Sequence, residues 1–149
     1  MSIFNQITRD IKAAMKAREK DKLEALRAIK SALMLAKTEK GPNHEISSEE
    51  ELKILQKLVK QRKDSAEIYK NQNREDLYEN EIFEAEVIGE YLPKPLSDDE
   101  LEKELSEIIK ETGAESMKDM GKVMGTATKK LAGKADGKRI SEKVRKLLG

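Results

Sequence analysis

The sequence is organised around one stretch near its end, Met117-Lys-Asp-Met-Gly-Lys-Val-Met-Gly-Thr-Ala-Thr-Lys-Lys-Leu-Ala-Gly-Lys-Ala-Asp-Gly-Lys-Arg139. This stretch contains four of the eight glycines in the 149-residue chain, and seven basic residues against two acidic ones. Glycine destabilises the interior of a helix by roughly 0.5–1 kcal/mol relative to alanine. A stretch that is both basic and rich in glycine therefore calls for an explanation that packing alone does not supply.

An advance of 100° per residue divides this stretch into three helical faces. The predicted buried face consists of Met117, Met120, Met124, Ala127 and Leu131. The second face is a flat strip of small residues, Gly121, Gly125, Thr128 and Ala132. The third face is a ridge of lysines, Lys118, Lys122 and Lys129. We expect Ser116 to cap this helix and Gly133 to end it.

Two interpretations of the glycine strip remain open. In one, the pair Gly121 and Gly125 lets another helix approach closely and the lysines form an ordinary solvated face. In the other, a phosphodiester backbone or a flat sugar surface lies on the strip while the lysines neutralise phosphates. The loop Gly133-Lys-Ala-Asp-Gly137 is open in the same way, since its glycines suit a tight turn and its amides suit a phosphate. Asp136 favours the turn, because it can cap the last helix itself.

Apolar residues at helical spacing along the rest of the chain predict an all-α protein. We expect an N-terminal domain of about four helices over residues 1–92 and a C-terminal three-helix domain over residues 97–149. The Pro93-Lys-Pro95 segment between them predicts a hinge, because proline cannot continue a helix. The expected helix stops are Gly41-Pro42, Asn71-Gln-Asn73 and Thr112-Gly113. The expected helix starts are Ser2, the pairs Asp21/Glu24, Ser48/Glu51 and Ser97/Glu100, and Asp136.

The composition separates charge along the chain. Charged residues make up 40% of the sequence and aromatic residues 3%, and the net charge of +1 divides into +7 over residues 117–149 and −6 over residues 1–116. Residues 1–37 carry a net charge of +5, so the acidic excess lies in the middle of the chain. A segregated positive charge is typical of a surface that meets a polyanion. The absence of cysteine, of a signal-peptide pattern and of a long apolar run predicts a cytoplasmic protein that does not enter a membrane.

The sequence offers no recognisable catalytic apparatus. His44, the sole histidine, is expected to be exposed in a loop, and there is no cysteine to act as a nucleophile. The acidic runs 49–51 and 98–100 lie in predicted first helical turns, where carboxylates interact favourably with the helix dipole. We therefore expect no catalytic residues, no metal and no cofactor, and a binding module is favoured over an enzyme.

Several motifs resemble a known family. Asp119-Met-Gly-Lys-Val-Met-Gly125 followed by Gly133-Lys-Ala-Asp-Gly-Lys138 is similar to the GatB/YqeY motif. Leu26-Arg-Ala-Ile-Lys30, Gln61-Arg-Lys-Asp-Ser65 and Glu90-Tyr-Leu-Pro93 extend the resemblance to the stand-alone YqeY-like proteins. One departure is Thr128, which stands where many relatives carry a proline.

The resemblance implies an all-helical fold whose C-terminal domain is similar to the tail of the B subunit of the glutamyl-tRNA/aspartyl-tRNA amidotransferase. That tail is implicated in holding tRNA. The resemblance also implies an association with carbon–nitrogen ligases that use glutamine as amide donor, although no amidation site is recognisable here, which leaves enzymatic activity open.

The resulting hypothesis is an accessory protein that binds tRNA or another structured RNA through its C-terminal basic face. The expected contact residues are Lys118, Gly121, Lys122, Gly125, Lys129, Lys130, Lys134, Lys138 and Arg139. The alternative is a protein adaptor whose acidic N-terminal domain docks a protein, such as an aminoacyl-tRNA synthetase or an amidotransferase.

Overall fold

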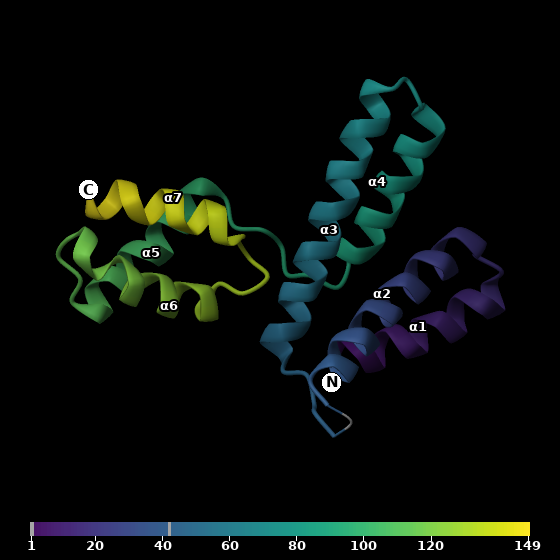
Figure 1. Cartoon of the computed structure of the whole chain (residues 1–149), viewed down its shortest axis with the longest axis horizontal. Coiled ribbons are helices and arrows are strands. Elements are labelled where there is room, and N and C mark those ends of the chain that lie inside the picture. The colour runs from purple at the N-terminus through teal and green to yellow at the C-terminus, as the bar shows by residue number, and fades with distance from the viewer. Residues whose placement is uncertain (1, 42) are drawn as a thin grey trace. The chain divides into compact units, whose positions relative to one another are not determined.

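The computed structural model describes residues 2–41 and 43–149, and within this part of the chain every regular element is helical. The prediction of an all-α fold is therefore confirmed. The chain forms two compact units, Met1–Leu92 and Pro93–Gly149 (Figure 1). Pro42, which was expected to help stop the second helix, lies outside the described residues.

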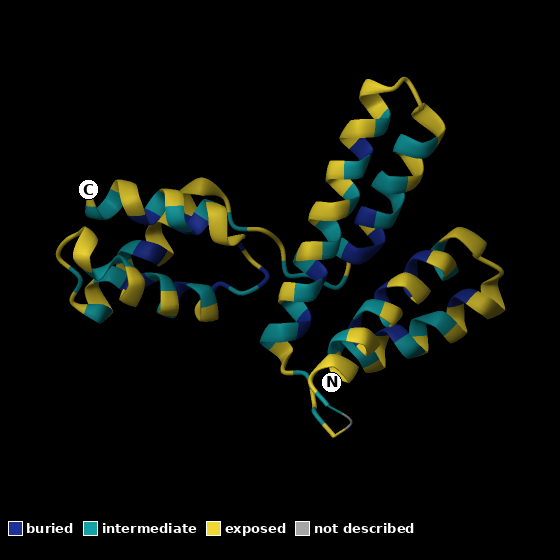
Figure 2. Cartoon of the chain, in the orientation of Figure 1, coloured by how far each residue is buried: buried dark blue, intermediate teal, exposed yellow. Residues whose placement is uncertain are grey.

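The first unit consists of two helical hairpins. Its helices are α1 (Ile3–Ala17), α2 (Lys20–Glu39), α3 (Ser48–Asn71) and α4 (Glu75–Gly89). Helix α1 packs on α2 and α3 packs along α4, while α2 also contacts both helices of the second hairpin. The core is aliphatic, and its fully buried large side chains are Ile7, Leu26, Ile29, Leu33 and Leu55. Figure 2 shows the buried positions of the chain in dark blue.

Two of the expected helix starts in this unit are wrong, and one is confirmed. Ser2 caps α1, because its hydroxyl accepts a hydrogen bond from the Asn5 amide. Helix α2 begins at Lys20 without a side-chain cap, so Asp21 lies in its first turn instead of before it. The chain turns between α1 and α2 at Arg18, whose φ of 58° is left-handed, and α2 begins two residues later.

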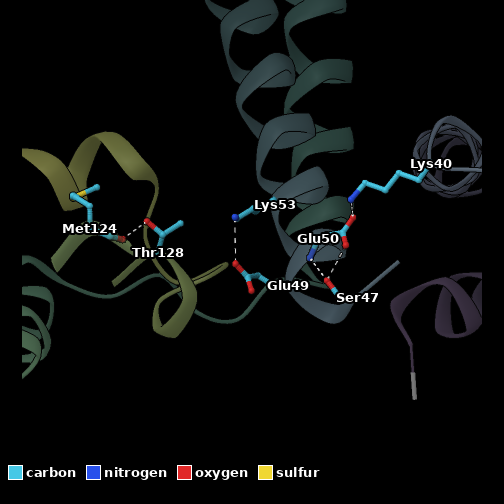
Figure 3. A network of polar contacts seen from close by, with 7 residues as sticks. All are labelled: Lys40, Ser47, Glu49, Glu50, Lys53, Met124 and Thr128. Carbon is cyan, nitrogen blue, oxygen red and sulfur yellow. Dashed lines mark hydrogen bonds and ion pairs between the residues drawn. The ribbon is translucent and has the colours of Figure 1, made fainter. Parts of the chain in front are cut away.

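Helix α3 is capped one residue earlier than expected. The hydroxyl of Ser47, and not that of Ser48, accepts from the Glu50 amide at 3.1 Å (Figure 3). Glu50 also pairs with Lys40, and the hydrogen bond from that ammonium holds the pKa of Glu50 below its ordinary value. Because the cap is formed by Ser47 and Glu50, Glu51 takes no part in it.

Glu51 instead ties two helices together. Its side chain is only 3% exposed, and its Oε2 accepts a hydrogen bond from the Phe4 amide at 3.0 Å. Phe4 lies in the first turn of α1, where backbone amides have no partner within the helix. A carboxylate of α3 therefore satisfies the start of α1 and stabilises it through the helix dipole.

Tyr91 closes the first unit at its C-terminal end. Its ring packs against the core, and its hydroxyl donates a hydrogen bond to the Asp10 carboxylate of α1. Burial, together with this carboxylate, raises the pKa of Tyr91 well above its ordinary value. The residue belongs to the Glu90–Pro93 motif, so this motif joins the end of the unit to its first helix.

Arg62, from the Gln61–Ser65 motif, joins α3 to α4. Its Nη1 lies 3.4 Å from Glu81 Oε2 and 3.3 Å from Glu84 Oε2. These two carboxylates are only 12% and 19% exposed. Desolvation raises the pKa of Glu84, and the charge of Arg62 opposes that rise. The guanidinium of Arg62 is therefore the shared ion-pair partner of both carboxylates.

The second unit is a small three-helix domain. It comprises α5 (Asp98–Thr112), the 3-10 turn η1 (Met117–Asp119), α6 (Met120–Lys130) and α7 (Gly137–Leu148). Each helix packs on the other two, around a core of Leu101, Leu105, Ile108, Val123, Ala127, Leu131, Ile140 and Val144. Ser97 caps α5 and Asp136 caps α7, both as expected, and Gly113 ends α5 with a φ of 69°.

Candidate nucleic-acid interface

The buried face of α6 agrees only in part with the expected one: Ala127 and Leu131 are buried as predicted, Met117 is not, and Val123 is buried without having been expected. Val123, Ala127 and Leu131 are buried at 0%, 0% and 2% exposure, whereas Met117 is 43% exposed. Met120 and Met124 lie at the edge of the core. Val123 was missed because the methionines form the longer apolar row in the sequence, whereas in the structure Val123 belongs to the core shared with α5 and α7. The true buried face is therefore turned away from Met117, which rotates the opposite face towards solvent.

The rotation places the glycine strip on the outside of the domain. Gly121 and Gly125 are both exposed, and a Cβ atom added at either would meet no heavy atom within 4 Å beyond the helix's own backbone. No other helix within the described part of the chain packs on this strip, so close helix approach inside the chain does not explain the two glycines. The helix backbone lies bare over one full turn.

A shallow depression of about 410 Å³ follows this bare backbone. All of its lining residues lie on α6: Gly121, Lys122, Gly125, Thr126, Lys129 and Lys130. Thr126 was not among the expected contact residues, although its helical position between Lys122 and Lys129 could have revealed it. The depression is a surface for an extended or flat ligand, because it has no enclosing wall.

Helix α6, which carries the depression, begins later and ends earlier than expected. Ser116 caps η1 as a 3-10 turn, so α6 itself begins only at Met120, and it ends at Lys130 instead of at Gly133. The hydroxyl of Thr128 donates to the Met124 carbonyl at 2.7 Å (Figure 3), which satisfies a threonine inside the helix.

Both carboxylates of the basic stretch accept a hydrogen bond from a nearby backbone amide, and that of Asp136 caps α7. Asp119 Oδ2 accepts from the Glu115 amide at 3.0 Å, and Asp136 Oδ1 accepts from the Arg139 amide at 2.8 Å. Neither forms an ion pair with a lysine in the part of the chain that the structure describes. The stretch therefore keeps its positive charge at the surface.

Some basic side chains of α6 and α7 form ion pairs with carboxylates of α5, and the others do not. It carries seven acidic and two basic residues. Three of its carboxylates engage cations: Glu111 lies 2.5 Å from Lys130, Asp98 lies 3.0 Å from Arg139 and Glu102 lies 4.0 Å from Lys143. Lys130 and Arg139 were expected phosphate contacts, and the structure gives both of them partners within the domain.

The remaining expected cations have no ion-pair partner among residues 2–41 and 43–149: Lys118, Lys122, Lys129, Lys134 and Lys138. All five are exposed. Arg145 and Lys146 on α7 are exposed as well. Both contribute to the positive charge of residues 117–149, but neither was among the expected contact residues. A polyanion would thus meet free ammonium groups on η1, on α6, in the loop before α7 and in the first turn of α7.

The loop between α6 and α7 is a turn. Gly133 has a φ of 80°, which supports the expected tight turn, whereas Gly137 is simply the first residue of α7. Asp136 accepts the hydrogen bond of the Arg139 amide at the start of α7, so a phosphate at this helix start would have one donor fewer. Lys134 and Lys138 flank this cap on the chain and are both exposed.

Other chemistry is sparse in the described chain. No group of three or more His, Cys, Asp or Glu side chains there is placed to hold a metal ion. None of its helices is long and apolar enough to cross a membrane. His44 is half-buried instead of exposed, and its Nε2 is buried without a hydrogen-bond partner.

Comparison with known proteins identifies the family. The family model described as Yqey-like protein matches residues 4–148. The chain belongs to the YqeY-like family. Two relatives of this YqeY-like chain are both named "Altered inheritance of mitochondria protein 41, mitochondrial". The protein of Pyrenophora tritici-repentis is 28% identical over 152 residues, which cover 99% of this chain and 81% of that protein. The protein of Clavispora lusitaniae is 33% identical over 115 residues, which cover 76% of this chain and 66% of that protein.

Proposed function

We propose that the C-terminal unit binds the phosphate backbone of a structured RNA, and of tRNA in particular, along the outer face of α6. The observation that carries the proposal is the bare, exposed strip of Gly121 and Gly125, bordered by three lysines without ion-pair partners in the described chain. A sugar–phosphate backbone can lie directly on a helix that has no side chains in the way. The neighbouring ammonium groups then neutralise its phosphates.

Recognition of this kind is by backbone and shape. Residues 93–149 contain no Phe, Tyr or Trp, so unpaired bases have no ring on which to stack. Lysine is a point charge and does not read base edges with the paired geometry of arginine. We therefore expect tight binding of folded RNA with little preference for sequence.

The direct test is a titration of unmodified tRNA at several salt concentrations. With the five free lysines on phosphates, affinity should fall about 500-fold between 50 and 200 mM salt, because each contact contributes roughly 0.9 to the slope on logarithmic axes. A triple variant, Lys118→Gln/Lys122→Gln/Lys129→Gln, leaves two contacts. Its affinity should fall only about 12-fold over the same range.

A matched triple variant controls for the loss of charge alone. Lys57→Gln/Lys60→Gln/Lys63→Gln removes three exposed lysines from α3 in the other unit. This control should keep the wild-type salt slope. The proposal is wrong if the two triple variants give the same slope, or if the wild-type protein shows no salt-dependent binding.

One observation favours a second candidate, a protein adaptor. Helix α4 carries six carboxylates and no basic residue, and those at Glu75, Asp76, Glu79 and Glu86 are exposed. A basic protein surface, such as that of a synthetase or an amidotransferase, would complement this helix. Capture of such a protein from a nuclease-treated lysate, abolished by Glu79→Lys/Glu86→Lys but not by the triple change on α6, would establish it.

In both candidate functions the chain is an accessory protein, and a partner carries out any amidation.

We also propose that the protein resides in the cytoplasm. The relatives' names place those proteins in mitochondria, and tRNA occurs in both compartments. Amide formation from glutamine by the purified protein alone would overturn the accessory role.

A further inference from the structure

The side chain of Arg139 faces into its own domain. Its Nη2 donates to the Leu96 carbonyl at 2.9 Å and to Asp98 Oδ1 at 3.0 Å. The side chain is only 34% exposed, whereas Asp98 is 82% exposed. A guanidinium that has given its donors to a carbonyl and a carboxylate has fewer left for a phosphate.

The chain around Leu96 is held from two directions. The Leu96 amide donates to the Lys134 carbonyl at 2.9 Å, while its own carbonyl accepts from Arg139. Lys134 lies in the α6–α7 loop and Arg139 in the first turn of α7. The segment leading into α5 is thereby fastened to the loop that carries Lys134, and the same first turn presents Lys138.

Resting on the proposed function, we infer that Arg139 is a positioning residue for RNA binding and not a phosphate contact. It clamps the loop between α6 and α7 against Leu96, so that Lys134 and Lys138 are held in place before RNA arrives. Without the clamp the loop must be ordered during binding. Affinity then falls although no phosphate contact is lost.

Three substitutions separate this role from direct contact. Arg139→Lys keeps the charge but loses the planar fork, so a phosphate contact would survive it and a clamp would not. We expect about fivefold weaker tRNA binding with an unchanged salt slope, the size of effect that ordering one or two side chains has. Arg139→Gln should also keep the slope, whereas Lys138→Gln, its matched control, should lower the slope by roughly 0.9.

Substitution of Asp98 should change the affinity for RNA in opposite directions for the two roles of Arg139. Asp98→Ala removes a negative charge and frees Arg139, which would strengthen binding if Arg139 met a phosphate. If Arg139 is a clamp, the same change weakens binding relative to the control Asp99→Ala. That control removes an equal charge from the same helix turn, and Asp99 forms no side-chain hydrogen bond or ion pair in the described chain.

The hydrogen-exchange rate of the Leu96 amide measures, in the absence of RNA, how firmly Arg139 holds the segment around Leu96. Arg139→Lys and Arg139→Gln should each speed this exchange about tenfold, as expected for losing a hydrogen bond to a charged group. Circular dichroism would verify that each variant retains its helices. Wild-type exchange in Arg139→Lys, or a lowered salt slope in Arg139→Gln, overturns the inference. If the wild-type protein fails to bind tRNA, the proposed function fails and the role in RNA binding with it, while the exchange data still decide whether the clamp exists.

Discussion

Replacing both glycines of the α6 strip with alanine should stabilise the protein and weaken RNA binding. Gly125 lies in the middle of α6 and Gly121 lies in its first turn. A methyl group at either position meets nothing within 4 Å, so it costs no clash. Alanine in place of an interior glycine stabilises a helix by up to about 1 kcal/mol, and we expect about half of that in the first turn.

The double variant Gly121→Ala/Gly125→Ala should therefore raise the free energy of unfolding of the C-terminal unit by about 1.5 kcal/mol. For a unit of this size the corresponding rise in Tm is about 6–12 °C. Two methyl groups on the bare strip would hold an RNA backbone away from the helix. If one phosphate contact is lost, affinity at 0.1 M salt falls about eightfold relative to the wild type.

The assay combines thermal unfolding followed by circular dichroism with tRNA titration at 0.1 M salt. Gly89→Ala is the matched control, because Gly89 is the last residue of α4 and a Cβ there also meets nothing within 4 Å. It should leave RNA affinity unchanged. The reasoning is refuted if the double variant is more stable and binds tRNA as tightly as the wild type, since the glycines would then serve no close approach.

Three further predictions concern the first unit. Glu51→Ala should lower the free energy of unfolding by about 2 kcal/mol in urea titrations, because it leaves an amide at the start of α1 without its buried acceptor; an effect below 0.5 kcal/mol would contradict this role. Tyr91→Phe removes the hydrogen bond to Asp10 and should cost about 1 kcal/mol. Since the folded-state pKa of Tyr91 is raised, wild-type stability should be lost as pH rises above about 10, and Tyr91→Phe should reduce that loss. Arg62→Gln should destabilise the protein by about 2 kcal/mol at pH 7 and by less at pH 4, because the raised pKa of Glu84 lets the fold take up a proton there; equal losses at both pH values would refute it.

Helix existence and most helix ends could be predicted from the sequence because their causes are local. Ser2, Ser97 and Asp136 cap amides only three residues away, and Gly113 ends its helix by its own left-handed conformation. Where two neighbouring residues were both suitable, as at Ser47 and Ser48, local chemistry did not distinguish them.

The candidate site depended on the sequence for its composition and on the tertiary structure for its orientation. The lysines and glycines of α6 are visible as a pattern, but which side of the helix is buried depends on the space that α5 and α7 leave. That space takes Val123 and excludes Met117, so the glycine strip turns outwards.

The sequence alone therefore specifies the helical class, most of the caps and the concentration of positive charge in residues 117–149. Which of these charges are free depends on how the helices pack. Lys130 and Arg139 look like their neighbours in sequence, yet Glu111 and Asp98 engage them from another helix. Glu51 likewise finds its partner 47 residues away. Pairing of this kind is set by which helices pack together, and no spacing along one helix records it.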